Sequence, residues 1–161
     1  MDNQQEVFVR MAMNAWNSHI KRADTLIDSL SDEQLLQQVA PGKNRGVYLV
    51  GHLAAVHDHL LELLGMGERI VANMDKSFIE SPDQHGVELL PVAEVRKAWK
   101  DTQQKCAEAF AKVTPAEWFM RHTKMTDEDL VKEPHRNRLN VLISRTDHLA
   151  YHLGQLILLK K

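Results

Sequence analysis

The chain has 161 residues, 43% of them hydrophobic, and its 20 basic and 22 acidic residues give a net charge of −2. This length fits one domain covering residues 1–161, because single hydrophobic cores are most common at about 100–150 residues. No block of Lys and Arg is long enough to form the positive patch that nucleic-acid binding requires. We therefore expect no nucleic-acid partner.

The compartment is indicated by what the first segment and the cysteine content lack. The segment MDNQQEVFVRMAMNAW has no secretion-signal pattern, and no apolar run is long enough to span a membrane, so we expect a cytoplasmic protein. Cys106 is the only cysteine, which rules out an intramolecular disulfide and suits a reducing compartment. We interpret Cys106 as a small buried residue rather than a catalytic nucleophile.

The first expected element is an amphipathic helix from about Gln5 to Ser29. Its apolar residues recur at three- and four-residue steps: Val9, Ala12, Met13, Trp16, Ile20, Ala23 and Ile27. Ser31 with Gln34 then matches a capping box that opens a short helix. The Pro- and Gly-containing loop PGKNRG ends this short helix.

A second long helix should begin near Val47 and end at Gly65 and Gly67. Its sequence, VYLVGHLAAVHDHLLELLG, is apolar on almost every side, which predicts a helix buried between other helices. The following residues, up to Leu90, have mixed periodicity and include Pro82 and Gly86. We expect this segment to be a partly helical crossover.

Two further long helices complete the pattern. The third should begin at Pro91, a residue suited to a first turn, and it carries one apolar stripe: Val95, Trp99, Thr102, Cys106 and Phe110. Thr114 with Glu117 caps a short turn, and the last helix runs from about Arg138 to Leu159. With no convincing strand, the sequence predicts an all-α four-helix bundle with a long crossover between its second and third long helices.

Three histidines stand out as candidate metal ligands. His148 and His152 are one helical turn apart on the same face, although this spacing alone also fits two partly exposed helix residues. His52 has apolar neighbours on every side, and a buried imidazole requires polar partners. If the second and last long helices are neighbours, the three imidazoles can bind one ion and leave a coordination position open.

Other polar residues could add to this site. His59 lies two turns after His52 on nearly the same face, so it could line the pocket or supply a fourth ligand, or it could be a solvated residue near the helix end. His57 points away from that face. Gln155 could bond a ligand or a substrate, or make a structural contact with a loop. Three carboxylates could supply a fourth ligand: Asp58, Glu62 and Asp147. For Asp147 we favour a solvated position or a contact with Arg145.

The segments DHLAYHLGQL and GVYLVGHLAAVHDHLLELLG, with the order of the helices, resemble the DinB/YfiT-like four-helix bundle proteins. In that family a histidine of the second helix and an HxxxH pair of the fourth bind a divalent metal. The resemblance implies that His52, His148 and His152 are the ligands here. Three positions depart from the pattern of relatives: Leu153 stands where relatives commonly have Arg, Tyr151 where many have a further His, and Ser144 where some have another His.

The resemblance also implies a class of chemistry. Relatives are associated with metal-dependent transferase or isomerase reactions that use a low-molecular-weight thiol, so the first hypothesis is a thiol S-transferase acting on a small electrophile. The alternatives are a metal-dependent hydrolase and a non-catalytic metal-binding stress protein. Imidazole ligands suit zinc or nickel among other metals. Relatives are often dimers, and the helix surfaces carry enough Leu and Met to allow a homodimer, but the sequence leaves the oligomeric state open.

Overall fold

The computed structural model describes residues 4–84 and 86–160, and it is all-helical over these residues. The helices follow in the order α1 (Gln4–Ser29), α2 (Asp32–Leu35), α3 (Gly46–Leu63), α4 (Asp75–Phe78), α5 (Val92–Phe110), α6 (Asp127–Lys132) and α7 (Arg138–Leu156). Three short 3₁₀ helices lie between and after them: η1 (Ala72–Met74), η2 (Ala116–Phe119) and η3 (Ile157–Leu159). Within the described ranges, β pairing is limited to an isolated bridge between Gln38 and Arg45. The all-α prediction is confirmed.

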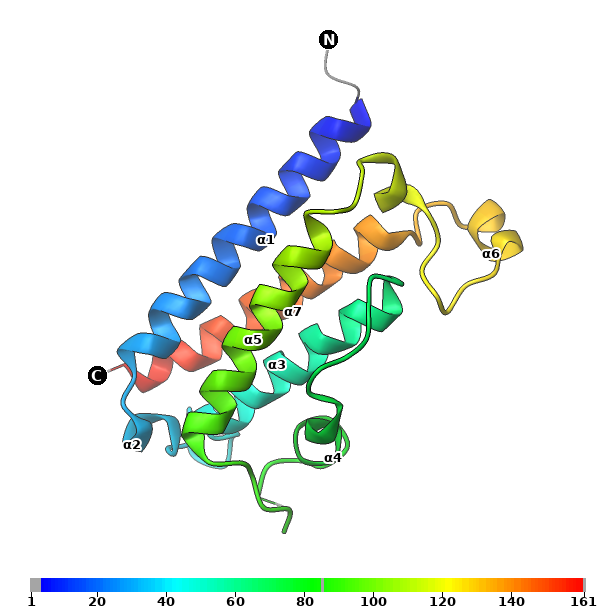
Figure 1. Ribbon diagram of the computed structural model, residues 1–161. Coiled ribbons are helices and arrows are strands. Elements are labelled where there is room, and N and C mark those ends of the chain that lie inside the picture. The colour runs from blue at the N-terminus through cyan, green and yellow to red at the C-terminus, as the bar shows by residue number, and fades with distance from the viewer. Residues whose placement is uncertain (1–3, 85, 161) are drawn as a thin grey trace.

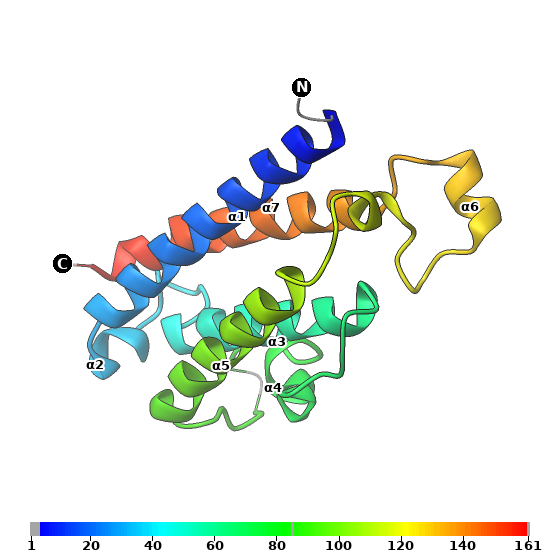
Figure 2. The ribbon, with the colours of Figure 1, turned by 45° about the horizontal axis from the view of Figure 1, so that its top comes forward.

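The four long helices lie side by side (Figures 1 and 2). Helix α3 packs most extensively on α5, and α1 packs on α7. Helix α3 also contacts α7, which makes these two helices neighbours. No helix in the described part of the chain is long and apolar enough to span a bilayer.

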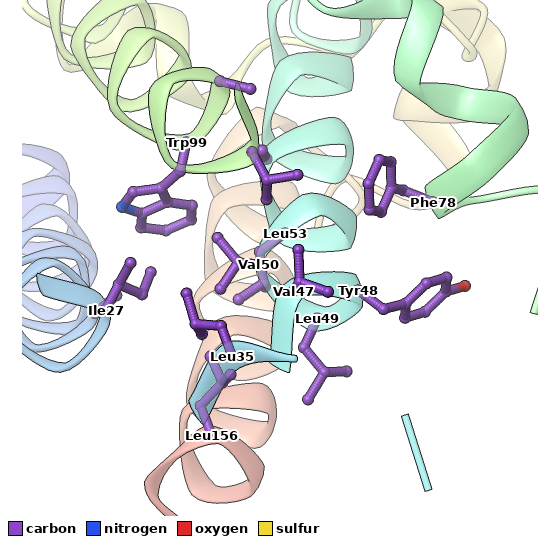
Figure 3. Packing of buried hydrophobic residues seen from close by; sticks show 14 of the residues in the cluster. Ile27, Leu35, Val47, Tyr48, Leu49, Val50, Leu53, Phe78, Trp99 and Leu156 are labelled. Carbon is purple, nitrogen blue, oxygen red and sulfur yellow. The ribbon is translucent and has the colours of Figure 1, made fainter. Parts of the chain in front are cut away.

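Helix α3 is buried on most of its surface, as its apolar sequence predicts. Figure 3 shows side chains of α3, among them Val50 and Leu53, between Ile27 and Trp99 on one side and Phe78 on the other. These residues belong to one hydrophobic cluster that joins α1, α3, α4, α5 and α7. The central helix therefore has a fixed position between its neighbours, and so do its polar residues.

Gly51 allows α4 to approach α3 closely. A Cβ atom at this position would overlap the ring of Phe78, which is fully buried. A residue with a side chain would therefore push α4 away from α3. This close approach matters for the site, because Gly51 directly precedes His52.

The observed boundaries agree with the sequence in most places. Ser31 and Gln34 form the expected capping box at α2, and Glu117 accepts hydrogen bonds from Thr114 before η2. Pro91 is the N-cap of α5 rather than a residue of its first turn. Helix α6 was not predicted, although Thr126 caps it through a box with the residue three positions later.

Candidate metal centre

The three candidate ligands meet at the seam between α3 and α7. His52 is on α3, and His148 and His152 are on α7. The Nε2 atom of His148 is 3.3 Å from Nε2 of His52 and 3.1 Å from Nε2 of His152. One nitrogen of each ring lies within 4.8 Å of the corresponding nitrogen of the others, so the group could hold a metal ion.

Hydrogen bonds on the far side of two rings fix which nitrogen carries the proton. Nδ1–H of His52 donates to the carbonyl oxygen of Phe78 at 2.7 Å. Nδ1–H of His152 donates to Oε1 of Gln155, also at 2.7 Å. A neutral imidazole has only one N–H, so Nε2 of both rings presents a lone pair to the centre.

The arrangement of the three rings fits a cation better than it fits hydrogen bonding. Only His148 can carry a hydrogen on Nε2. That single hydrogen cannot form good hydrogen bonds to the Nε2 lone pairs of both His52 and His152. Its Nδ1 is buried without a hydrogen-bond partner, so its tautomer is not fixed as in the other two rings. Two nitrogens bound to one tetrahedral zinc at about 2.0–2.1 Å lie about 3.3–3.4 Å apart. The two Nε2 separations are close to that value.

Burial keeps these imidazoles neutral. Desolvation, together with the neighbouring His152 and His52, lowers the pKa of His148 to about 4. Desolvation also lowers the pKa of His52 and of His152. Neutral imidazole is the form that binds a metal, so the ligands need not lose a proton first at neutral pH.

Residues around the rings define the edge of the site. The ring of Tyr48 stacks parallel to that of His52, with centroids 6.2 Å apart. The exposed Tyr151 lies beside His152, and its hydroxyl accepts a hydrogen bond from Nε2 of Gln155. Gln155 therefore contacts a candidate ligand directly, which was one of its two sequence interpretations.

The other candidate ligands lie outside the group of three. Nε2 of His59 is 3.2 Å from Oδ2 of Asp75, and 41% of the His59 side chain is exposed. Asp58 is fully buried and accepts hydrogen bonds from Arg69 and from two backbone N–H groups, so its oxygens are already occupied. Two carboxylates are exposed: Glu62 and Asp147. Across residues 4–84 and 86–160, no fourth His, Cys or carboxylate joins the three histidines.

Two further sequence interpretations agree with the structure. His57 points away from the site and is fully buried between the rings of Trp16 and Trp99, where its Nδ1 pairs with Gln103. Cys106 is buried, and desolvation raises the pKa of its thiol to about 12. A thiol that stays protonated at neutral pH is a poor nucleophile.

Sequence reasoning did not find the carbonyl of Phe78. A backbone acceptor has no residue signature, and the crossover that carries it has mixed periodicity. The available signal was Gly51, which stands next to His52 and permits the close approach of α4.

The fold and the site thus define an all-helical protein with a three-histidine candidate metal centre between two neighbouring helices. The family model of the DinB superfamily matches residues 15–156, and the chain belongs to that superfamily. The match covers the second long helix and the HxxxH helix. A comparison with curated proteins found no match.

Proposed function

We propose that the chain forms the four-helix bundle of its superfamily and binds one divalent metal ion through His52, His148 and His152. The observation that carries this proposal is the convergence of three Nε2 atoms, two of which are unprotonated because the opposite nitrogen donates elsewhere. Zinc and nickel are the proposed metals, because both bind neutral imidazole well.

We further propose a metal-dependent enzyme of the thiol S-transferase type, joining a low-molecular-weight thiol to a small electrophilic substrate. A bound divalent ion would supply a Lewis acid that favours the ionised form of a thiol at an open position. Structural zinc sites normally have four protein ligands, whereas catalytic sites keep one position open. Three donors in the described part of the chain support the catalytic reading.

The surrounding residues of the chain would hold this site in shape. Phe78 and Gln155 orient His52 and His152 through their Nδ1–H groups, as outer partners of metal-binding histidines generally do. His52 and His148 are partly buried, and His152 is buried. Access of a small molecule to the three nitrogens is part of the proposal.

Two alternatives compete with transfer to a thiol. A hydrolase would use water in place of the thiol at the open position, and ester or amide cleavage would then depend on an ionisation near pH ~7. A non-catalytic stress protein would use the ion only to link α3 to α7. The second alternative requires a fourth ligand that blocks the open position.

Measurement of the metal content tests whether the histidines bind a metal ion. Purified protein, loaded with zinc or nickel and desalted, should contain one equivalent by mass spectrometry, and the His148→Ala, His152→Ala double variant should contain none. His59→Ala is the matched control, because its histidine lies on α3 outside the group. Equal metal content in the double variant and the wild type would refute the ligand assignment.

Thermal melting and thiol assays extend that test. When the free metal concentration is 100 times the dissociation constant, binding to the folded state adds about 2.7 kcal/mol to the free energy of unfolding. An equal melting temperature with and without metal would argue against a link between α3 and α7. Loaded protein should then join a thiol to members of an electrophile panel, and ester cleavage without thiol use would favour the hydrolase.

Three broader properties remain proposals. We propose one domain across residues 1–161, a cytoplasmic location and a homodimer. Exposed apolar side chains near the end of the chain, Ile157 and Leu158, support an interface between copies. Sedimentation analysis at micromolar concentration would show the oligomeric state.

A further inference from the structure

Arg145 is a partly buried cation that has no anionic partner among the described residues. It lies on α7 one helical turn before His148. Its Nε atom is buried and makes no hydrogen bond, and no carboxylate of residues 4–84 or 86–160 lies within ion-pair distance of its guanidinium. A desolvated, unpaired charge lowers stability, so its presence calls for an explanation.

Three other partly buried arginines, Arg45, Arg69 and Arg138, have polar partners within the chain. Arg69, whose side chain is 9% exposed, pairs with Asp58 and Asp75. Arg45 forms a two-pronged contact with the buried carboxylate of Asp83. Arg138 has no carboxylate partner among the described residues, but its Nε–H donates to the carbonyl oxygen of Arg121. Arg145 differs from all three, because its buried Nε has neither an anion nor a hydrogen-bond acceptor.

Helical spacing places Arg145 on the same face of α7 as two candidate ligands, because it precedes His148 by three residues and His152 by seven. The Arg145 charge is near enough to help lower the pKa of His52 and of His148, and also that of the inward-facing His57. Desolvation also lowers the pKa of Arg145, which places part of the group out of water.

We infer that Arg145 binds a carboxylate of the small molecule that reaches the three histidines. This inference rests on the proposed function, because it assigns a second point of attachment to the ligand of that site. Guanidinium and carboxylate form a planar pair of charge-assisted hydrogen bonds, which a neutral amide cannot reproduce. Arg145 and His148 are three residues apart on one helix, a rise of about 4.5 Å. A ligand a few atoms long can therefore span both points.

The inference explains why the chain keeps an unpaired cation there. Groups that serve a ligand are often unfavourable for the stability of the empty protein, and their removal then stabilises it. Removal of an arginine that serves the fold should instead lower the stability of the protein. We therefore expect Arg145→Met to raise the melting temperature of the metal-free protein. Arg69→Met should lower it, because it leaves the fully buried carboxylate of Asp58 and the partly buried one of Asp75 without their cation.

A matched pair of thiols tests the carboxylate contact. Cobalt-loaded protein would be titrated with 3-mercaptopropionate and with its neutral amide, 3-mercaptopropanamide, and the sulfur-to-cobalt charge-transfer band would give each dissociation constant. The wild type should prefer the carboxylate about 10-fold or more, since a hydrogen bond to a charged group contributes about 1.5–3 kcal/mol. Arg145→Met should lose this preference, and Arg145→Lys should keep part of it.

The outcomes separate the two proposals. If cobalt is not taken up, or if neither thiol produces the band, the proposed function fails. Calorimetry of the same two compounds on the metal-free protein then tests Arg145 by itself. If the carboxylate is not preferred in either form of the wild type, or if Arg145→Met keeps the preference, the Arg145 inference is wrong.

Discussion

His52 and His57 lie on the same helix, five residues apart, yet they face opposite seams with different chemistry. His57 is enclosed between Trp16 and Trp99 and has neighbours suited to packing. His52 faces two more imidazoles and presents an unprotonated nitrogen to them. Both have a lowered pKa because of burial. Burial of a histidine therefore does not identify a metal site; convergence of free lone pairs does.

The largest expected effect concerns stability at the packing histidine. His57→Ala leaves a cavity between two tryptophans and should lower the free energy of unfolding by about 2–4 kcal/mol. Urea titration of the metal-free protein measures this loss. His52→Ala is the counterpart: it should cost less stability but abolish metal uptake, while the folded fraction of the His57 variant still binds metal. If His57→Ala abolished metal uptake and His52→Ala caused the larger loss of stability, the roles assigned to the two histidines would be wrong.

Acid should weaken the metal-free protein through the same buried rings. Burial lowers the pKa of His57 to about 3 in the folded state, whereas the unfolded chain binds this proton near the usual value of about 6.5. Stability is therefore complete above pH ~6.5 and is lost as the pH falls towards 3, by at most about 1.4 kcal/mol per pH unit for one group. His148, with a pKa near 4, adds to this loss.

Urea titrations between pH 7.5 and 4.5 would show the dependence. His57→Gln should flatten the profile, whereas the same change at the exposed His135 should leave it as in the wild type. Superimposable profiles for the wild type and His57→Gln would mean that His57 is not neutral in the folded protein.

Gly51 and Gly154 provide the next comparison, since each is a helical glycine near a candidate ligand. A methyl group at position 51 meets the ring of Phe78, while position 154 has open space. Gly51→Ala should lower the free energy of unfolding by about 1–3 kcal/mol and weaken metal binding, because it displaces the carbonyl that orients His52. Gly154→Ala should stabilise the protein by up to about 1 kcal/mol through helix propensity.

Calorimetric melting and metal titration of both glycine variants would test this. If Gly51→Ala binds metal as tightly as the wild type, the close approach of α4 does not matter for the site.

The sequence was informative wherever the signal was a periodic pattern of side chains. The almost wholly apolar sequence of α3 predicted its burial, and helical spacing placed His148 and His152 on one face. Helical spacing could not show whether His59 joins the site. The environment of His59 also depends on the crossover, which contributes Asp75 as the partner of its ring. The acceptor for His52 is a backbone atom contributed by a segment without clear periodicity, so no residue type marked it.

The sequence also did not show which charged side chains have partners in the folded protein. Whether a charged residue on a helix is solvated, paired or stranded depends on which faces pack together. Asp58 is buried and saturated with hydrogen bonds, and Arg145 is half-buried and unmatched, although both resemble ordinary surface residues in the sequence. The tertiary contacts of α3 decide the case of Asp58, and those of α7 decide the case of Arg145.

The smallest expected effect compares two glutamines that each accept an N–H from a histidine. Gln155 holds His152, and Gln103 holds His57. Gln155→Leu should weaken metal binding about 10-fold, as loss of an outer partner commonly does. It should change the stability of the metal-free protein little, because this residue is partly exposed. Gln103→Leu should do the reverse, since it strands a buried N–H at a cost of about 1–3 kcal/mol without touching the centre.

Metal titration by calorimetry and urea unfolding, applied to both glutamine variants, would resolve this crossed pattern. These variants separate the orientation of the histidine rings from their role as metal ligands, because all three imidazoles remain in both variants. If Gln155→Leu kept the wild-type metal affinity, rotation of the His152 ring would not limit binding, and the fixed tautomer would lose its role in the proposed centre. If Gln103→Leu weakened metal binding as much as Gln155→Leu, the two seams of α3 would be coupled. His52 and His57 would then belong to one polar network rather than two.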